Sequence, residues 1–149
     1  VLYRLDGQPA VTGSSKFSDV SAGQYYTNAV IWATENGIVS GYGNGMFGSD
    51  ALLSREQMAT ILYNYAKYKQ YDVSKVRGLD VFTDKDTVAP YAVRAMQWAY
   101  ANEIINGSST TTLSPKGTAT RAQVAAILMR FDEKVKTPAN AAAKTAAGK

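Results

Sequence analysis

Two arginines each follow a hydroxyl residue at the predicted start of a helix. Residues 54–57 read Ser-Arg-Glu-Gln, and residues 120–123 repeat the pattern as Thr-Arg-Ala-Gln. In both, the hydroxyl residue and the glutamine three positions later match the capping box, which satisfies unpaired backbone N–H groups. A guanidinium group beside such N–H groups and the positive end of the helix dipole attracts a carboxylate. The pattern predicts anion sites at Arg55 and Arg121, although a capping box can also serve stability alone.

The candidate ligand-binding residues are polar, charged or glycine residues of these motifs and of neighbouring loops. They are Ser54, Arg55, Gln57, Thr120, Arg121, Gln123, Asp19, Asp84, Gly41, Tyr42 and Gly107. Asp19 and Asp84 have two interpretations, since each can cap the chain entering a helix or accept hydrogen bonds from sugar hydroxyls. Tyr42, between two glycines, can stack on a sugar ring or pack inside the protein.

The chain repeats itself once. The Phe-x-Asp motif at residues 17–19 returns at 82–84, and the Trp-Ala pair at 32–33 returns at 98–99. A unit of this size shares its core and its grooves with its neighbours. Binding sites are therefore expected where the copies meet.

Each copy is predicted to be a helix, a Gly-rich or Ser-rich loop, and a second helix. Apolar residues at helical spacing, with Tyr25 and Tyr91 at the front of the stripes, place Trp32 and Trp98 in the core. Phe47 and Leu113 are expected to plug their loops. The predicted fold is all-α, with tandem helix-loop-helix repeats packed as a pseudo-symmetric bundle. The boundaries are 1–16 (the end of a preceding repeat and a linker), 17–66 (repeat), 67–81 (linker), 82–131 (repeat) and 132–149 (flexible tail or linker).

The composition excludes several kinds of chemistry. With no cysteine and no histidine among 149 residues, thiol catalysis, disulfides, Cys/His zinc sites and a histidine base are absent. An enzyme built on Asp19, Glu56 or Asp84 would need two carboxylates close together, which the spacing does not show. The net charge of +4 includes +2 from residues 132–149, which is weak support for nucleic-acid binding. No apolar run approaches the roughly 18 residues of a membrane span. We therefore predict no catalysis, cofactor, metal site, nucleic-acid partner or membrane insertion.

The Phe-x-Asp opening, the Trp-Ala helix with its following glycine and the Ser/Thr-Arg-x-Gln helix start resemble S-layer homology repeats. The resemblance covers 17–66 and 82–131, with residues 1–6 as the end of an earlier repeat. It implies an extracellular, noncatalytic anchor that binds an anionic, commonly pyruvylated, secondary cell-wall polysaccharide at the bacterial cell surface. It also implies that Arg55 and Arg121 meet the acidic ligand in grooves between repeats. Both copies carry glutamine where the family usually has glutamate, which leaves the ligand preference open.

A second interpretation is a protein–protein or self-assembly module of the cell surface layer. The chain begins at Val1, inside a predicted helix, and we interpret it as a piece of a longer exported protein. Its first repeat is incomplete, so another chain could fill the gap. A stable dimer formed without glycan would favour assembly, whereas a glycan-binding monomer would favour anchoring.

Overall fold

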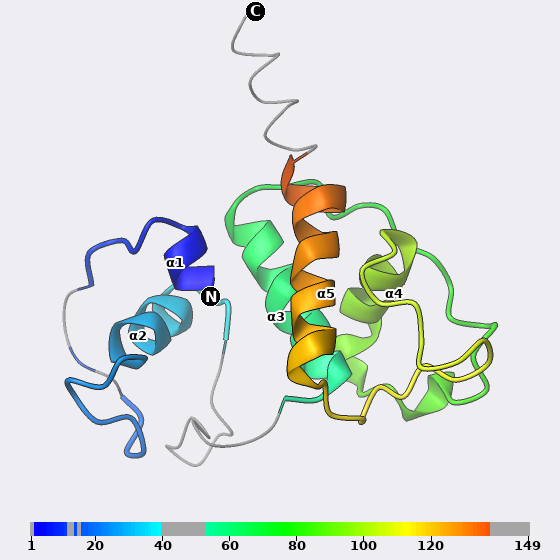
Figure 1. Cartoon of the computed structure of the whole chain (residues 1–149), viewed down its shortest axis with the longest axis horizontal. Coiled ribbons are helices and arrows are strands. Elements are labelled where there is room, and N and C mark those ends of the chain that lie inside the picture. Colours follow the sequence, from blue (N-terminus) through cyan, green and yellow to red (C-terminus); the bar gives the residue numbers. More distant parts are fainter. Residues whose placement is uncertain (1, 12–13, 15, 40–52, 138–149) are drawn as a thin grey trace, which may run out of the picture. The chain divides into compact units, whose positions relative to one another are not determined.

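The structure is a computed structural model that describes residues 2–11, 14, 16–39 and 53–137 (Figure 1). Within these residues every regular element is helical, which confirms the all-α prediction. None of the described helices is long and apolar enough to cross a membrane. The chain divides into two compact units, Val1–Ala51 and Leu52–Lys149, which are described separately below. Three residues named above, Gly41, Tyr42 and Phe47, lie outside the described part.

The first unit contains α1 (Leu2–Leu5) and α2 (Thr27–Glu35). The ring of Tyr3 contacts Trp32, with 5.5 Å between ring centroids, and joins the two helices. Trp32 is buried, as predicted. Helix α2 ends where the Nδ2 atom of Asn36 donates to the carbonyl oxygen of Trp32 at 2.8 Å.

The second unit contains three α-helices and three short helical turns. They are α3 (Arg55–Tyr68), η1 (Lys85–Thr87), η2 (Pro90–Ala92), α4 (Val93–Ala101), α5 (Arg121–Phe131) and the π-helical turn η3 (Asp132–Lys136). Figure 1 shows these elements in the second unit, and aromatic rings join the three long helices. Trp98 of α4 contacts Tyr63 of α3 and Phe131 of α5, at centroid distances of 5.5 and 6.3 Å. Trp98 is fully buried, so this aromatic cluster forms the centre of the core.

Both predicted capping boxes are confirmed. The Oγ atom of Ser54 accepts from the backbone N–H of Gln57 at 3.2 Å, and the Gln57 Oε1 atom accepts from the N–H of Ser54 at 2.9 Å. Thr120 and Gln123 form the same pair of bonds at 3.1 and 2.9 Å. The helices α3 and α5 therefore begin at equivalent positions of the two copies.

The expectation that Tyr25 and Tyr91 belong to the buried stripes is wrong. Tyr25 is 90% exposed and Tyr91 is 60% exposed. Tyr25 precedes the start of α2, and Tyr91 lies in η2 rather than α4. The helical periodicity that buries the Trp-Ala pairs does not extend back to these tyrosines, because the α-helical turns begin after them.

The loop after α4 is held in a tight, well-packed conformation. Leu113 is fully buried, which confirms its predicted role as a plug. Gly107 has a φ angle of +102°. A Cβ atom there would lie 2.8 Å from Cε1 of Phe82 and 2.9 Å from the carbonyl oxygens of Ser109 and Thr112. Only glycine fits this turn without rearrangement.

Candidate anion-binding groove

Arg55, the first residue of α3, connects the two copies. Its backbone N–H donates to the carbonyl oxygen of Gly117 at 2.9 Å, and its side-chain Nε donates to that of Leu113 at 3.1 Å. The residue is only 7% exposed. Burial and, to a smaller extent, the nearby charge of Arg130 lower the pKa of Arg55, yet an arginine stays protonated at any physiological pH. The structure thus fixes a permanent positive charge against a loop of the other copy.

A cavity of about 220 Å³ opens beside this guanidinium group. Its lining residues come from the start of α3, the loop after α4 and one face of α5, and are Arg55, Ile104, Ile105, Asn106, Gly107, Gln123, Ala126, Ile127 and Arg130. We call this cavity the Arg55 groove. Three predicted site residues, Arg55, Gly107 and Gln123, therefore meet in one place.

The groove has two cationic residues and no carboxylate in its lining. Arg130 donates from Nη1 to the carbonyl oxygen of Ile104 at a long 3.4 Å. Within residues 53–137, neither Arg55 nor Arg130 forms an ion pair with an acidic side chain. Two guanidinium groups without a carboxylate partner make the groove suited to an anion.

Sequence reasoning did not identify Arg130, but the signal was present. Gln123, Ala126, Ile127 and Arg130 follow one another at spacings of three, one and three, which places them on one face of a helix. The helix face that carries Gln123, a predicted site residue, therefore also carries Arg130.

Asp84 stands at the N-cap position of η1, but its side chain makes no capping hydrogen bond, so the side-chain cap expected there is wrong. Its Oδ1 and Oδ2 atoms accept hydrogen bonds from the backbone N–H groups of Leu113 and Ser114, both at 2.8 Å. Partial burial raises the pKa of this carboxyl, but these hydrogen bonds lower it by more, so the pKa lies below its ordinary value of 3.8. Asp84 thereby fixes the peptide whose carbonyl oxygen accepts from Arg55.

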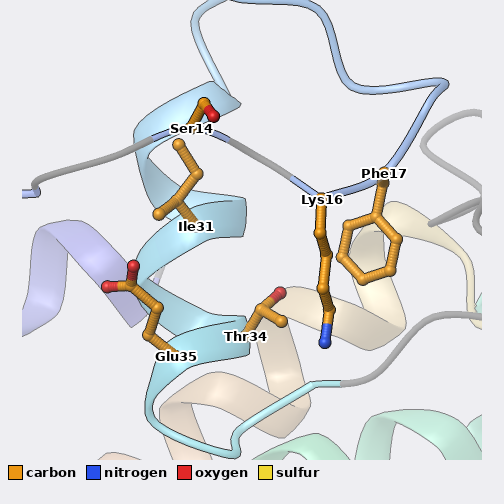
Figure 2. Close-up of a pocket in the computed structure, with 6 residues that line it drawn as sticks. All are labelled: Ser14, Lys16, Phe17, Ile31, Thr34 and Glu35. Atoms are coloured by element: carbon orange, nitrogen blue, oxygen red, sulfur yellow. The ribbon is translucent and has the colours of Figure 1, made fainter.

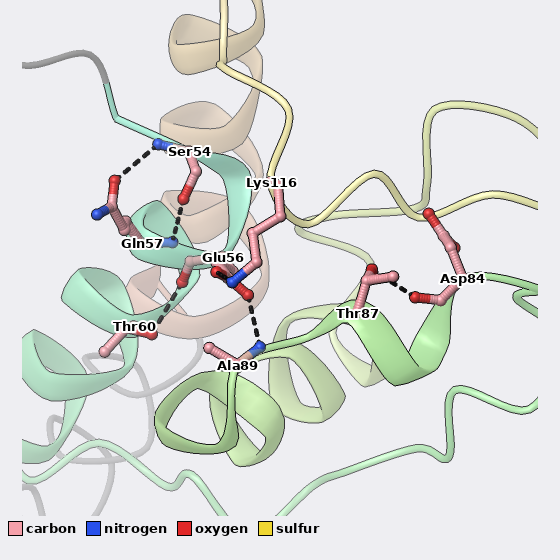
Figure 3. Close-up of polar contacts among 8 residues, drawn as sticks. All are labelled: Ser54, Glu56, Gln57, Thr60, Asp84, Thr87, Ala89 and Lys116. Atoms are coloured by element: carbon pink, nitrogen blue, oxygen red, sulfur yellow. Dashed lines mark hydrogen bonds and ion pairs between the residues drawn. The ribbon is translucent and has the colours of Figure 1, made fainter.

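Glu56, beside Arg55, is a buried structural carboxylate (Figure 3). Its Oε2 atom accepts from the backbone N–H of Ala89 at 2.9 Å, and its Oε1 atom pairs with the Nζ atom of Lys116 at 2.5 Å. Ala122 occupies the equivalent place in the second copy. Glu56 therefore clamps the start of α3 onto the second copy, while α5 carries no such group.

The other predicted residues that the structure describes are absent from the lining of the groove. Ser54, Gln57 and Thr120 are engaged in the capping boxes, and Figure 3 draws the box formed by Ser54 and Gln57. Arg121 is exposed and absent from the lining of the groove. Asp19 is half-buried in the first unit.

The first unit has a separate hollow of about 200 Å³ (Figure 2). It is lined by Ser14, Lys16, Phe17, Ile31, Thr34 and Glu35. The ammonium group of Lys16 lies 5.6 Å from the centre of the Phe17 ring. None of the predicted site residues lines this hollow.

Helical copies that build an arginine-lined groove at their junction are typical of a repeat module that binds a ligand. The chain belongs to the S-layer homology domain family, which matches residues 16–59 and 81–125. Members of this family are anchoring rather than catalytic domains. The chain is accordingly an extracellular module of the cell surface, and its role is anchoring.

Several relatives are similar over most of this chain. It is 33% identical over 134 residues to an amylopullulanase of Thermoanaerobacterium thermosulfurigenes, covering 90% of this chain and 7% of the relative. It is 32% identical over 126 residues to the surface-layer 125 kDa protein of Lysinibacillus sphaericus, covering 83% and 10%. It is 28% identical over 123 residues to a cellulosome-anchoring protein of Acetivibrio thermocellus, covering 81% and 27%. The chain thus spans a small part of each relative's length.

Proposed function

We propose that this module anchors its protein by binding an acidic, pyruvylated secondary cell-wall polysaccharide in the Arg55 groove. The observation that carries the proposal is the guanidinium group of Arg55, which lines a cavity and has no carboxylate partner among residues 53–137. A surface-layer protein and an anchoring protein among the relatives support the anchoring role. The carboxylate of a pyruvyl ketal is the group expected to meet Arg55.

The rest of the lining suits a substituted sugar. Ile104, Ile105 and Ile127 are buried and form an apolar floor on which one face of a sugar ring can pack. Asn106 and Gln123 also line the cavity. The Gln123 Oε1 atom already accepts from the N–H of Thr120, which leaves its Nε2 group to donate to a hydroxyl group, and the Oδ1 atom of Asn106 can accept from one. The cavity is smaller than the roughly 300–1,000 Å³ of pockets for drug-sized ligands. It therefore suits one sugar unit and its acidic substituent rather than a long segment of polysaccharide.

Charge-assisted hydrogen bonds supply the expected affinity. Such a bond contributes about 1.5–3 kcal/mol, roughly twice the contribution of a neutral bond. Because Arg55 is already held by Leu113, little side-chain freedom remains to be lost when the ligand binds. The proposed site is therefore preorganised for a carboxylate.

Co-sedimentation with cell-wall sacculi of Lysinibacillus sphaericus tests this function. The variant Arg55→Met removes the charge and keeps most of the apolar stem, and Arg94→Met is the control, because Arg94 is exposed on α4 and absent from the groove lining. We expect the wild-type chain and Arg94→Met to pellet with sacculi and Arg55→Met to remain largely in solution. Mild acid treatment of the sacculi, which removes pyruvyl ketals, is expected to abolish pelleting of the wild type.

Two results would contradict the proposal: undiminished pelleting after acid treatment, or equal pelleting of Arg55→Met and the wild type. Circular dichroism of each variant establishes that it is folded. Sedimentation of the chain without sacculi tests the self-assembly alternative, which a stable dimer would favour.

A further inference from the structure

Arg130 lies in the same groove as Arg55 but belongs to the other copy by sequence. It is partly exposed on α5 and lines the cavity together with Gln123, Ala126 and Ile127, which share its face of the helix. The hydrogen bond that it donates to Ile104 is long and leaves most of its five N–H donors available. Its position, burial and free donors are those of a ligand-contacting side chain.

The two arginines are close enough to repel each other. Repulsion from Arg130 is the second cause, after burial, of the lowered pKa of Arg55. In the part of the chain that the structure describes, no acidic side chain pairs with either of them. An anion bound between the two guanidinium groups replaces this repulsion with two attractions.

We infer that Arg130 is a second anion-binding residue of the Arg55 groove, and that the pair selects a ligand that presents two negative charges over one that presents a single charge. This inference rests on the proposed function, because it concerns the ligand of the same groove. A monoanion leaves one of the two positive charges of the cavity uncompensated, whereas a dianion neutralises both. A sugar unit with two acidic groups, or an acidic substituent beside a phosphodiester, fits this requirement.

The second cation is not a constant feature of the repeat. The residue equivalent to Arg130 in the first full copy, 66 positions earlier, is Asn64, whereas residues 1–6, the end of the preceding repeat, carry Arg4 at this position. The preference for a doubly charged ligand is therefore expected at the Arg55 groove, where Arg130 supplies the second charge, and not where this position holds an asparagine.

Titration of the full chain with small anions tests the inference without any wall material. Malonate, a dianion at pH 7, and acetate, a monoanion, are titrated while the arginine Nε–Hε signals are followed by ¹H–¹⁵N NMR. We expect malonate to shift the Arg55 and Arg130 signals and to bind more tightly than acetate. In Arg130→Gln we expect malonate affinity to fall about tenfold, the effect of losing one charge-assisted hydrogen bond, and the preference over acetate to disappear. Arg130→Lys keeps the charge and is expected to keep the preference at reduced affinity.

Arg94→Gln is the matched control, since it removes an equal charge from α4 away from the groove, and it is expected to bind malonate as the wild type does. The inference is overturned if Arg130→Gln retains the malonate preference, or if Arg94→Gln loses as much affinity. Failure of the wild type to pellet with sacculi would contradict the proposed function alone, because the malonate titration does not depend on the wall polysaccharide.

Discussion

Arg55 and Asp84 are coupled through one residue, Leu113, whose carbonyl oxygen accepts from Nε of Arg55 at 3.1 Å while its N–H donates to Oδ1 of Asp84 at 2.8 Å. The two charged side chains come from different copies of the repeat and never need to touch. Asp84 fixes the loop, and the loop fixes the arginine. The orientation of the proposed ligand-binding charge thus depends on a carboxylate outside the groove.

The first prediction concerns pH. Because the folded-state pKa of Asp84 is lowered, its contribution to stability is fully present above the ordinary pKa of 3.8 and is lost as the pH falls through the lower folded value. We expect unfolding of the wild type in urea to become easier as the pH falls below about 4. Asp84→Asn should lower stability at pH 7 and flatten the part of this acid dependence that Asp84 causes. An acid dependence identical in wild type and variant would contradict this assignment.

The second prediction concerns the buried clamp at Glu56. Glu56→Ala leaves the backbone N–H of Ala89 without its acceptor, which is expected to cost about 1–3 kcal/mol of the free energy of unfolding. Lys116→Ala keeps that hydrogen bond but removes the cation from a carboxylate whose side chain is only 3% exposed, so its cost measures how far the ion pair compensates the burial of Glu56. Urea unfolding followed by tryptophan fluorescence measures both. Equal losses in the two variants would show that the ion pair, rather than the hydrogen bond to Ala89, dominates.

The third prediction concerns Gly107. Gly107→Ala places a Cβ atom against Phe82 and two carbonyl oxygens at a positive φ angle. We expect a loss of about 2 kcal/mol or more in the free energy of unfolding, together with weaker wall binding, because the turn lines the groove. Gly78→Ala is the control, since Gly78 is exposed and its nearest new neighbour is the flexible side chain of Asp80; it should change stability by less than about 0.5 kcal/mol.

The fourth prediction separates the two motif arginines. Arg55 lines the groove, whereas Arg121 is exposed at the start of α5 and lies outside the groove lining. In co-sedimentation with sacculi, Arg55→Met is therefore expected to lose most binding and Arg121→Met to retain most of it. The thermal unfolding midpoint of Arg121→Met should stay within a few degrees of the wild type. A larger binding loss in Arg121→Met than in Arg55→Met would move the proposed site to the other motif.

Local patterns predicted local structure well. Both capping boxes depend on residues three positions apart, and both are confirmed. The hydrogen-bond partners of Asp84 are 29 and 30 residues away in the sequence. A local pattern could therefore not show whether Asp84 caps a helix or binds the backbone of a distant loop. The spacing of Tyr25 and Tyr91 places them on the amphipathic stripes of the first helices, but the α-helices begin after them.

Only part of the candidate groove could be predicted from the sequence. The repeat motif identified Arg55, but the cavity exists because residues 104–107 and one face of α5 pack beside it. Arg130 was missed because it lies outside the repeated motif, although its spacing from Gln123 was visible. The boundary between the compact units falls between the two helices of the first copy, so that α3 packs with the second copy.

The attachment of α3 to the loop of the second copy has a mechanical consequence. Two backbone hydrogen bonds, from Arg55 to Gly117 and from Ala119 to Leu53, join segments that are more than sixty residues apart in the sequence. We expect tension that pulls these segments apart to break the hydrogen bonds and to open the groove, because Arg55 belongs to both. If the proposed ligand binds there, it would be released when this junction ruptures, and the junction would set the upper limit on the tensile strength of the attachment.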